Sequence, residues 1–457
     1  MKNINIQKIQ QYLSLASLFF IPLKLSWTYI VLIPLILLWL FSNRANFAEK
    51  IPCDKIVIAF IFFIFSMLIS SMFGIHPSQS LIAILKLTFF SISIFPLIEL
   101  FQTLHRNISF SFLIAGQSIS SAYSVIEALS LGKAKQIFIG PVTESGQIAL
   151  VFVLLVGFTL HNFLNLKTEN NKNSPIGRKY STYYYLSASF ILSCLFSFTA
   201  FSADLGFNEK LTTILKFSLL MILSVSLVYW LLFMVKNIAK QQNIEKLNHW
   251  FTVGAFPFIL SALICNLKRG PWLGVLVGVS LFFILNHKKL LLPFLIACLI
   301  AFFSFKPIQQ RLTDSSNDFF ITGGRNMMWQ IGLELSIRYP LGIGYDNSAL
   351  LRKFDPDIPE GHRHFHNTLL NLVVETGWLS LGIFSWWLFE TLKRAFSNSN
   401  NVLSQACGCA LISWLVAGSV EYNFGDSEVL LVVFLMIAAI ISIHGPTKLA
   451  TSSDFSI

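Results

Sequence analysis

Apolar stretches of about the length that crosses a lipid bilayer recur along nearly the whole chain. A transmembrane helix needs roughly 20 mainly apolar residues. The candidate stretches are 11–23, 27–42, 56–72, 82–100, 108–129, 146–163, 184–202, 211–235, 250–265, 272–286, 289–305, 368–390, 403–420 and 428–443. Several are short, so we expect about twelve to fourteen spans. Only 12% of the residues are charged, against about 25% in soluble domains. The sequence therefore predicts an all-α, polytopic integral membrane protein.

The Lys and Arg residues between these stretches predict the orientation. With the N-terminus in the cytoplasm and the spans alternating, far more of them fall in cytoplasmic segments than in short outer loops, as the positive-inside rule requires. This orientation places both termini in the cytoplasm. It also places the one long polar segment, near the C-terminal third, on the outer face.

The same pattern predicts four parts of the chain. Residues 1–305 form an N-terminal transmembrane bundle, whose first helix is retained and not cleaved as a signal peptide. Residues 306–366 form a large outer, periplasmic loop with short helices, 367–443 the C-terminal transmembrane helices, and 444–457 a cytoplasmic tail.

Charge and cysteine usage exclude two other classes of protein. The net charge is +11, but the chain has no basic block of the kind that binds nucleic acid. The six Cys residues are scattered and do not form a disulfide framework, and Cys407-Gly-Cys409 is interpreted as helix packing, not as a metal site. Lys86 and Lys216 lie inside apolar stretches and are expected to reach the interface, without forming a proton relay.

The large loop has a predicted internal structure. A helix is expected from Arg325 to about Ile337, with Trp329, Leu333 and Ile337 on one face at helical spacing. Tyr339-Pro340 should end this helix. An apolar helix over 368–375 follows the loop, and we expect Thr376-Gly377 to interrupt it.

Three residues that can carry chemistry lie where apolar helices meet the outer face: Arg269, Arg325 and His366. The planar donor fork of Arg matches phosphate oxygens, and His can accept a proton near neutral pH. The group suits a diphosphate attached to a lipid. Simpler interpretations exist for each: a side chain that reaches the interface, an exposed loop charge and a helix cap, respectively.

Further candidates flank these three residues. His362, His364 and His366 would share one face of a strand and could suggest zinc, but no Cys or closely following carboxylate completes the ligand set, so we expect no metal. Glu421 and Asp426, in the last outer loop, could orient a sugar or the histidine, or could be solvated loop charges.

Three motifs resemble the O-antigen ligase and polymerase superfamily of bacterial envelope glycosyltransferases. Lys268-Arg269-Gly270-Pro271-Trp272-Leu273 is similar to its first arginine motif. Gly324-Arg325-Asn326-Met327-Met328-Trp329, followed by Tyr339-Pro340-Leu341-Gly342-Ile343-Gly344, is similar to its second. His366-Asn367-Thr368-Leu369-Leu370, followed by Glu375-Thr376-Gly377, is similar to its histidine motif. The resemblance covers roughly residues 262–390.

This resemblance implies transfer of a glycan from undecaprenyl diphosphate to an acceptor at the periplasmic face of the bacterial inner membrane, in lipopolysaccharide biosynthesis. His366 would be the general base, and Arg269 and Arg325 would bind the diphosphate, without a metal or cofactor. Lys268, Asn367 and His364 would contact substrate. An O-antigen ligase, with lipid A–core as acceptor, is favoured. An O-antigen polymerase and a protein O-oligosaccharyltransferase of the same superfamily are the alternatives.

A lipid-linked oligosaccharide flippase or other transporter is the alternative from a different class. Transporters often have related halves and binding sites near the bilayer midplane. No repeated half is visible here, and the distinctive polar residues lie at the outer edge. A scaffold without catalysis would leave the grouping of Arg269, Arg325 and His366 unexplained, so the sequence favours an enzyme.

Overall fold

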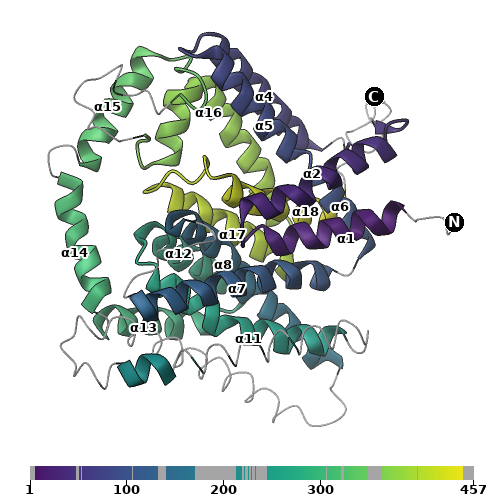
Figure 1. The fold of residues 1–457 in the computed structure, drawn as a ribbon, viewed down its shortest axis with the longest axis vertical. Coiled ribbons are helices and arrows are strands. Elements are labelled where there is room, and N and C mark those ends of the chain that lie inside the picture. The colour runs from purple at the N-terminus through teal and green to yellow at the C-terminus, as the bar shows by residue number, and fades with distance from the viewer. Residues whose placement is uncertain are drawn as a thin grey trace, which may run out of the picture.

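A computed structural model describes residues 6–47, 51–52, 54–104, 106–131, 140–169, 213–218, 221, 225, 228, 232, 244–304, 306–320, 324–347, 352, 363–398 and 400–445. The longer elements within these residues are all helices (Figure 1). They are α1 (Ile6–Phe20), α2 (Leu25–Ser42), α4 (Lys55–Met72), α5 (Pro77–Ser91), α6 (Ile94–Thr103), α7 (Arg106–Leu131), α8 (Pro141–Glu169), α11 (Ile244–Cys265), α12 (Arg269–Asn286), α13 (Lys288–Ser304), α14 (Lys306–Phe320), α15 (Arg325–Arg338), α16 (Thr368–Ala395), α17 (Val402–Gly418) and α18 (Ser427–His444).

Eight helical segments of the described chain are long and apolar enough to cross a membrane: Leu25–Ser42, Lys55–Met72, Pro77–Thr103, Ile108–Ser130, Val142–His161, Arg269–Asn286, Thr368–Ala395 and Ser427–His444. A ninth candidate is bent by 84° between α13 and α14, and α17 is a shorter apolar helix. The prediction of an all-α, multi-pass membrane protein is confirmed. The number of twelve to fourteen spans stays a prediction, because the expected spans 184–202 and most of 211–235 lie outside the described residues.

The loop helix lies where it was predicted, and the face that it buries differs from the one that carries Leu333 and Ile337. α15 ends at Arg338, followed by Tyr339. Met328, Ile331 and Leu335 are its buried apolar residues, whereas Leu333 and Ile337 are 52% and 75% exposed. Both sets have helical spacing, so periodicity alone could not identify the face that packs. In Figure 1, α14 lies at the left edge, between α13 below and α15 above.

Polar contacts join different helices at each of the two ends of the bundle. At one, Arg394 near the end of α16 contacts both Asp54, which caps α4, and the carbonyl of Gly445 after α18. At the other, Nε2 of Gln147 donates to the carbonyls of Ile21 and Glu428, joining α8 to the residue after α1 and to the first turn of α18. We call this second end, where α5, α8, α12, α16 and α18 begin, the site end.

A stripe of glycines brings α12 close to α17. A Cβ atom built on Gly274 would lie 2.4 Å from the carbonyl oxygen of Ser413, and one on Gly278 would lie 2.9 Å from that of Cys409. Small residues at four-residue spacing allow the backbones of membrane helices to approach this closely. The N-terminus of α12, with Arg269, is therefore held against the end of α17 and the loop that follows.

The predicted interruption at Gly377 is confirmed and links α16 to the turn after α15. Gly377 has φ 82° and ψ 171° inside α16. The break allows the carbonyls of Val374 and Glu375 to accept hydrogen bonds from the amides of Ile343 and Gly344, at 2.9 Å each. These helix carbonyls, which the break leaves without an intrahelical partner, thus accept the hydrogen bonds that the loop amides donate.

We expect Gly377→Ala to destabilise the protein markedly. A Cβ atom at this position would lie 2.6 Å from the carbonyl oxygen of Pro340, and its backbone conformation costs a non-glycine residue roughly 1–3 kcal/mol. Thermal unfolding of the purified protein should show a lower midpoint. Gly382→Ala, on the same helix with open space around the new methyl group, is the control. Equal midpoints for both variants would contradict this account of the break.

Candidate active site

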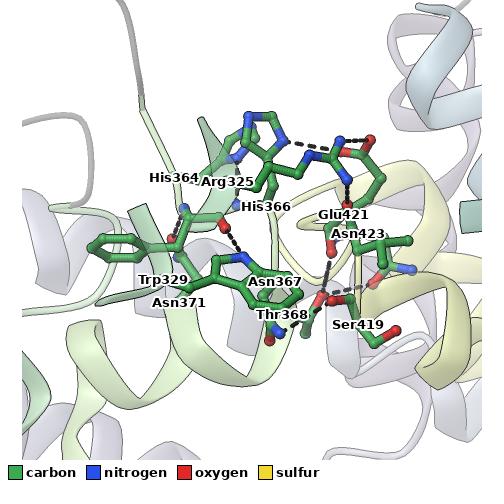
Figure 2. Close-up of polar contacts among 12 residues, drawn as sticks. Arg325, Trp329, His364, His366, Asn367, Thr368, Asn371, Ser419, Glu421 and Asn423 are labelled. Atoms are coloured by element: carbon green, nitrogen blue, oxygen red, sulfur yellow. Dashed lines mark hydrogen bonds and ion pairs between the residues drawn. The ribbon is translucent and has the colours of Figure 1, made fainter. Parts of the chain in front are cut away.

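The side chains of Arg325 and His366 meet at one carboxylate, that of Glu421, at the site end (Figure 2). Nη2 of Arg325 lies 2.8 Å from Oε1 of Glu421, and Nδ1 of His366 lies 3.1 Å from Oε2. Nη1 of Arg325 also donates to the carbonyl of Val420 at 2.7 Å. Three segments distant in the sequence therefore supply one cluster: the start of α15, the turn before α16 and the α17–α18 loop.

Glu421 is an ionised partner for both groups and not a solvated loop charge. Its side chain is 20% exposed. Burial raises its pKa, but the hydrogen bond with His366 and the charge of Arg325 lower it further, so that the pKa falls to about 2. An ionised carboxylate accepts from Nδ1–H of His366, which places the lone pair of the neutral imidazole on Nε2.

The turn that carries His366 is clamped on both sides. Nε1 of Trp329, on α15, donates to the carbonyl of Phe365 at 2.9 Å, and Oδ1 of Asn371 accepts from the amide of Phe365 at 3.3 Å. The ring of Phe365 is fully buried. His366 itself has φ 50°, a conformation that non-glycine residues seldom adopt and that clusters at functional sites.

Asn367 and Thr368 fasten the start of α16 to the α17–α18 loop. Oδ1 of Asn367 accepts from the amide of Leu370 at 3.0 Å, an N-cap bond, and its Nδ2 donates to the carbonyl of Ser419 at 3.1 Å. The hydroxyl of Thr368 bonds to Asn423 at 3.0 Å. The sequence suggested that Asn367 contacts substrate, and the structure gives it a capping role.

Lys268 and Arg269 lie beside this cluster, at the start of α12. A Cβ atom on Gly270 would be 3.5 Å from Cγ of Glu421. Burial lowers the pKa of Lys268, and the carboxylate of Glu421 opposes that shift. The charges of Arg311, Arg269 and Arg325 also act on Lys268 and lower its pKa. Several cations therefore lie within electrostatic reach of Lys268, beside Glu421, which is a suitable environment for a polyanion.

Arg269 also lines a cavity of about 500 Å³ between α8, α11, α12, α13 and α14, which we call the α12 cavity. Its walls are almost entirely apolar and include Phe152, Phe256, Trp272 and Phe294. A guanidinium at the edge of an apolar cavity suits an amphiphile with an anionic head and a hydrocarbon tail.

The remaining predicted residues lie near the cluster in different ways. The ring of His364 is 4.4 Å from that of His366 and 5.7 Å from that of Tyr422, between centroids. Asp426 is the N-cap residue of α18, and burial raises its pKa to about 7. Among the described residues, no three His, Cys, Asp or Glu side chains gather as metal ligands. His362 lies outside those residues, so the three-histidine hypothesis stays untested.

Sequence reasoning missed Arg311 and underrated Glu421. Arg311 lies on α14, in which no motif was recognised. The chain bends by 84° between α13 and α14, and the charge of Arg311 acts on Lys268. Glu421 lies more than 50 residues after His366 in a short loop, and nothing in the local sequence indicates which side chains it meets. Both interactions depend on tertiary structure alone.

Comparison with known families identifies the segment that holds most of this cluster. A family model described as O-antigen ligase matches residues 253–385, from within α11 to within α16. Arg269, Arg325 and His366 lie inside the match, and Glu421 lies beyond it. A search of curated proteins finds no match. The resemblance drawn from the motifs is thus confirmed: this multi-pass membrane protein carries a domain of the O-antigen ligase superfamily in residues 253–385.

Proposed function

We propose that the protein is an O-antigen ligase, which transfers a glycan from undecaprenyl diphosphate to lipid A–core at the periplasmic face of the inner membrane. The family match supports the coarser class of membrane glycosyltransferase. The observation that carries the proposal is the junction of Arg325, His366 and Glu421, with Arg269 and Lys268 alongside. With both termini in the cytoplasm, as the distribution of Lys and Arg predicts, the site end is the outer end of the bundle.

The donor would be held by its diphosphate. Arg325 has five N–H donors, of which two bond to Glu421 and Val420, so further donors can reach phosphate oxygens. Arg269 joins the cationic cluster to the α12 cavity, whose apolar walls suit the isoprenoid chain. When the sugar–diphosphate bond breaks, negative charge grows on the leaving oxygen, and fixed cations stabilise that charge.

The acceptor hydroxyl would lose its proton to Nε2 of His366 as its oxygen attacks the anomeric carbon of the donor sugar. The new glycosidic bond forms while the bond to the diphosphate breaks, and the electron pair leaves with the isoprenyl diphosphate. Glu421, bonded to Nδ1, fixes the tautomer and stabilises the imidazolium that results, as an orienting carboxylate does in other His-based sites. No step requires a metal or a cofactor.

Deletion of the gene, followed by gel analysis of surface polysaccharide, tests the proposed acceptor. A ligase leaves free lipid-linked polymer and bare core. Core carrying a single repeat would identify a polymerase instead. Normal lipopolysaccharide with an unmodified glycoprotein would identify a protein transferase, and unchanged glycans of every kind would contradict the proposal.

Glu421→Gln should lower the rate of transfer by about 10²-fold, the lower end of what a positioned base contributes. The amide keeps the size of the side chain but removes the charge that orients His366 and pairs with Arg325. The rate should be measured with purified protein and a lipid-linked donor. Asp426→Asn, in the same loop, is the control and should retain most of the activity. An equal rate for Glu421→Gln and the wild type would exclude the orienting role.

A further inference from the structure

A second cavity at the site end lies outside the machinery described so far. It has a volume of about 570 Å³, within the range of about 300–1,000 Å³ that is common for ligand sites. α5, the 345–346 turn, the α17–α18 loop and α18 form its walls. We call it the α5–α18 cavity.

Polar groups and aromatic rings both line this cavity. Ser78, Gln79 and Asp346 supply donors and acceptors, while Phe90, Phe424 and Phe434 supply apolar surface. Asp346 has φ 62° and its carbonyl accepts from Nε2 of Gln79 at 3.1 Å, so the turn that presents its side chain is fixed to α5. Hydrogen-bonding groups beside aromatic surface match the hydroxyl groups and the apolar C–H surface of a sugar ring.

The charges of the cavity argue against a diphosphate. Among the described residues that line it, Lys86 is the one cation and Asp346 the one carboxylate, and the charge of Lys86 opposes the rise that burial causes in the pKa of Asp346. The cluster around Glu421, in contrast, contains Lys268, Arg269 and Arg325. A neutral, polyhydroxylated ligand suits a balanced cavity, whereas a polyanion suits the cationic cluster.

Tyr422 connects the two sites. It lines the cavity, follows Glu421 directly in the chain, and its ring lies 5.7 Å from that of His364, which in turn lies 4.4 Å from that of His366. Its hydroxyl donates to Oε2 of the buried Glu375 at 3.3 Å. The rings of Tyr422 and His364 therefore lie between the cavity and the imidazole of His366 and join the two sites.

We propose that the α5–α18 cavity binds a saccharide unit of the acceptor, beside the cluster that contains His366. The assignment of the ligand as acceptor rests on the proposed function. The binding of a sugar does not, because it follows from the walls of the cavity. The two can therefore be tested separately.

Binding is tested first, without transfer. Saturation-transfer NMR on the full-length protein, with glucose, galactose and N-acetylglucosamine as probes, should give a signal for at least one hexose. Ala83→Trp, which fills the cavity, should abolish that signal, and Asp346→Asn should weaken it without changing the turn. Leu85→Trp, on the exposed side of α5, should preserve it. No signal on the wild type, or an equal signal with Ala83→Trp, would overturn the proposal.

Kinetics then test the assignment to the acceptor. Ala83→Trp should raise the KM for the acceptor by about tenfold or more, the effect of losing one or two hydrogen bonds to charged groups, and leave the KM for the donor unchanged. Leu85→Trp should change neither constant. An increase in the donor KM alone would overturn the assignment. If the wild type transfers no glycan at all, the proposed function fails, while the hexose signal still decides whether the cavity binds sugars.

Discussion

His366→Ala is expected to reduce glycan transfer by about 10²–10⁴-fold, the contribution of a positioned general base, while the protein still folds and inserts. The reason is the hydrogen bond between Nδ1 and Glu421, which orients the ring and leaves Nε2 as the basic atom. The measurement is restoration of surface glycan in a deletion strain, together with the amount of protein in the membrane fraction.

The control for this variant is His76→Ala. His76 lies exposed before α5, also at the site end, and has no part in the cluster, so its loss should leave surface glycan normal. Near-normal glycan with His366→Ala, at equal protein level, would refute the assignment of His366 as the base.

Arg325→Lys and Arg269→Lys should each lower transfer by about 10-fold or more although the charge is retained, and the Ala variants by about 10²–10³-fold. Lys is a point charge and cannot present the planar fork of donors that fits phosphate. In Arg325 the fork also bonds to Glu421 and Val420 at the same time. A single ammonium group cannot reproduce both contacts and still hold a phosphate.

Arg338→Lys is the matched control, because Arg338 occupies the last turn of the same helix, α15, and is exposed. Its activity should equal that of the wild type. Full activity in both Arg269→Lys and Arg325→Lys would mean that these side chains only reach the interface, as the simpler interpretation holds. The rates should be compared with one donor preparation and at saturating acceptor.

Much of the fold follows from local sequence. Apolar length predicted the span at 56–72, observed as Lys55–Met72, and Thr376-Gly377 predicted the break in α16. The buried face of α15 could not be predicted, because Leu333 and Leu335 are equally apolar and only the residues packed against them decide which one is buried. The role of the glycine stripe of α12 likewise could not be predicted, because it depends on the close packing of α12 against α17.

Only part of the candidate site could be predicted, and the reason is similar. Arg269, Arg325 and His366 each occupy a helix start next to a polar loop, which a sequence reveals. The partner that joins two of them, Glu421, comes from another loop, and its ionisation depends on the neighbours that it meets there. Arg311 and the α5–α18 cavity also arise only when separate helices come together.

Binding of undecaprenyl diphosphate to the purified full-length protein tests most directly whether these cations form a diphosphate site. The wild type should bind the diphosphate, and Arg269→Ala or Arg325→Ala should weaken binding by about tenfold or more. His366→Ala should keep an affinity close to that of the wild type, since the imidazole acts on the acceptor. Unchanged affinity in both arginine variants would contradict the account, because the guanidinium groups would then have no part in holding the donor.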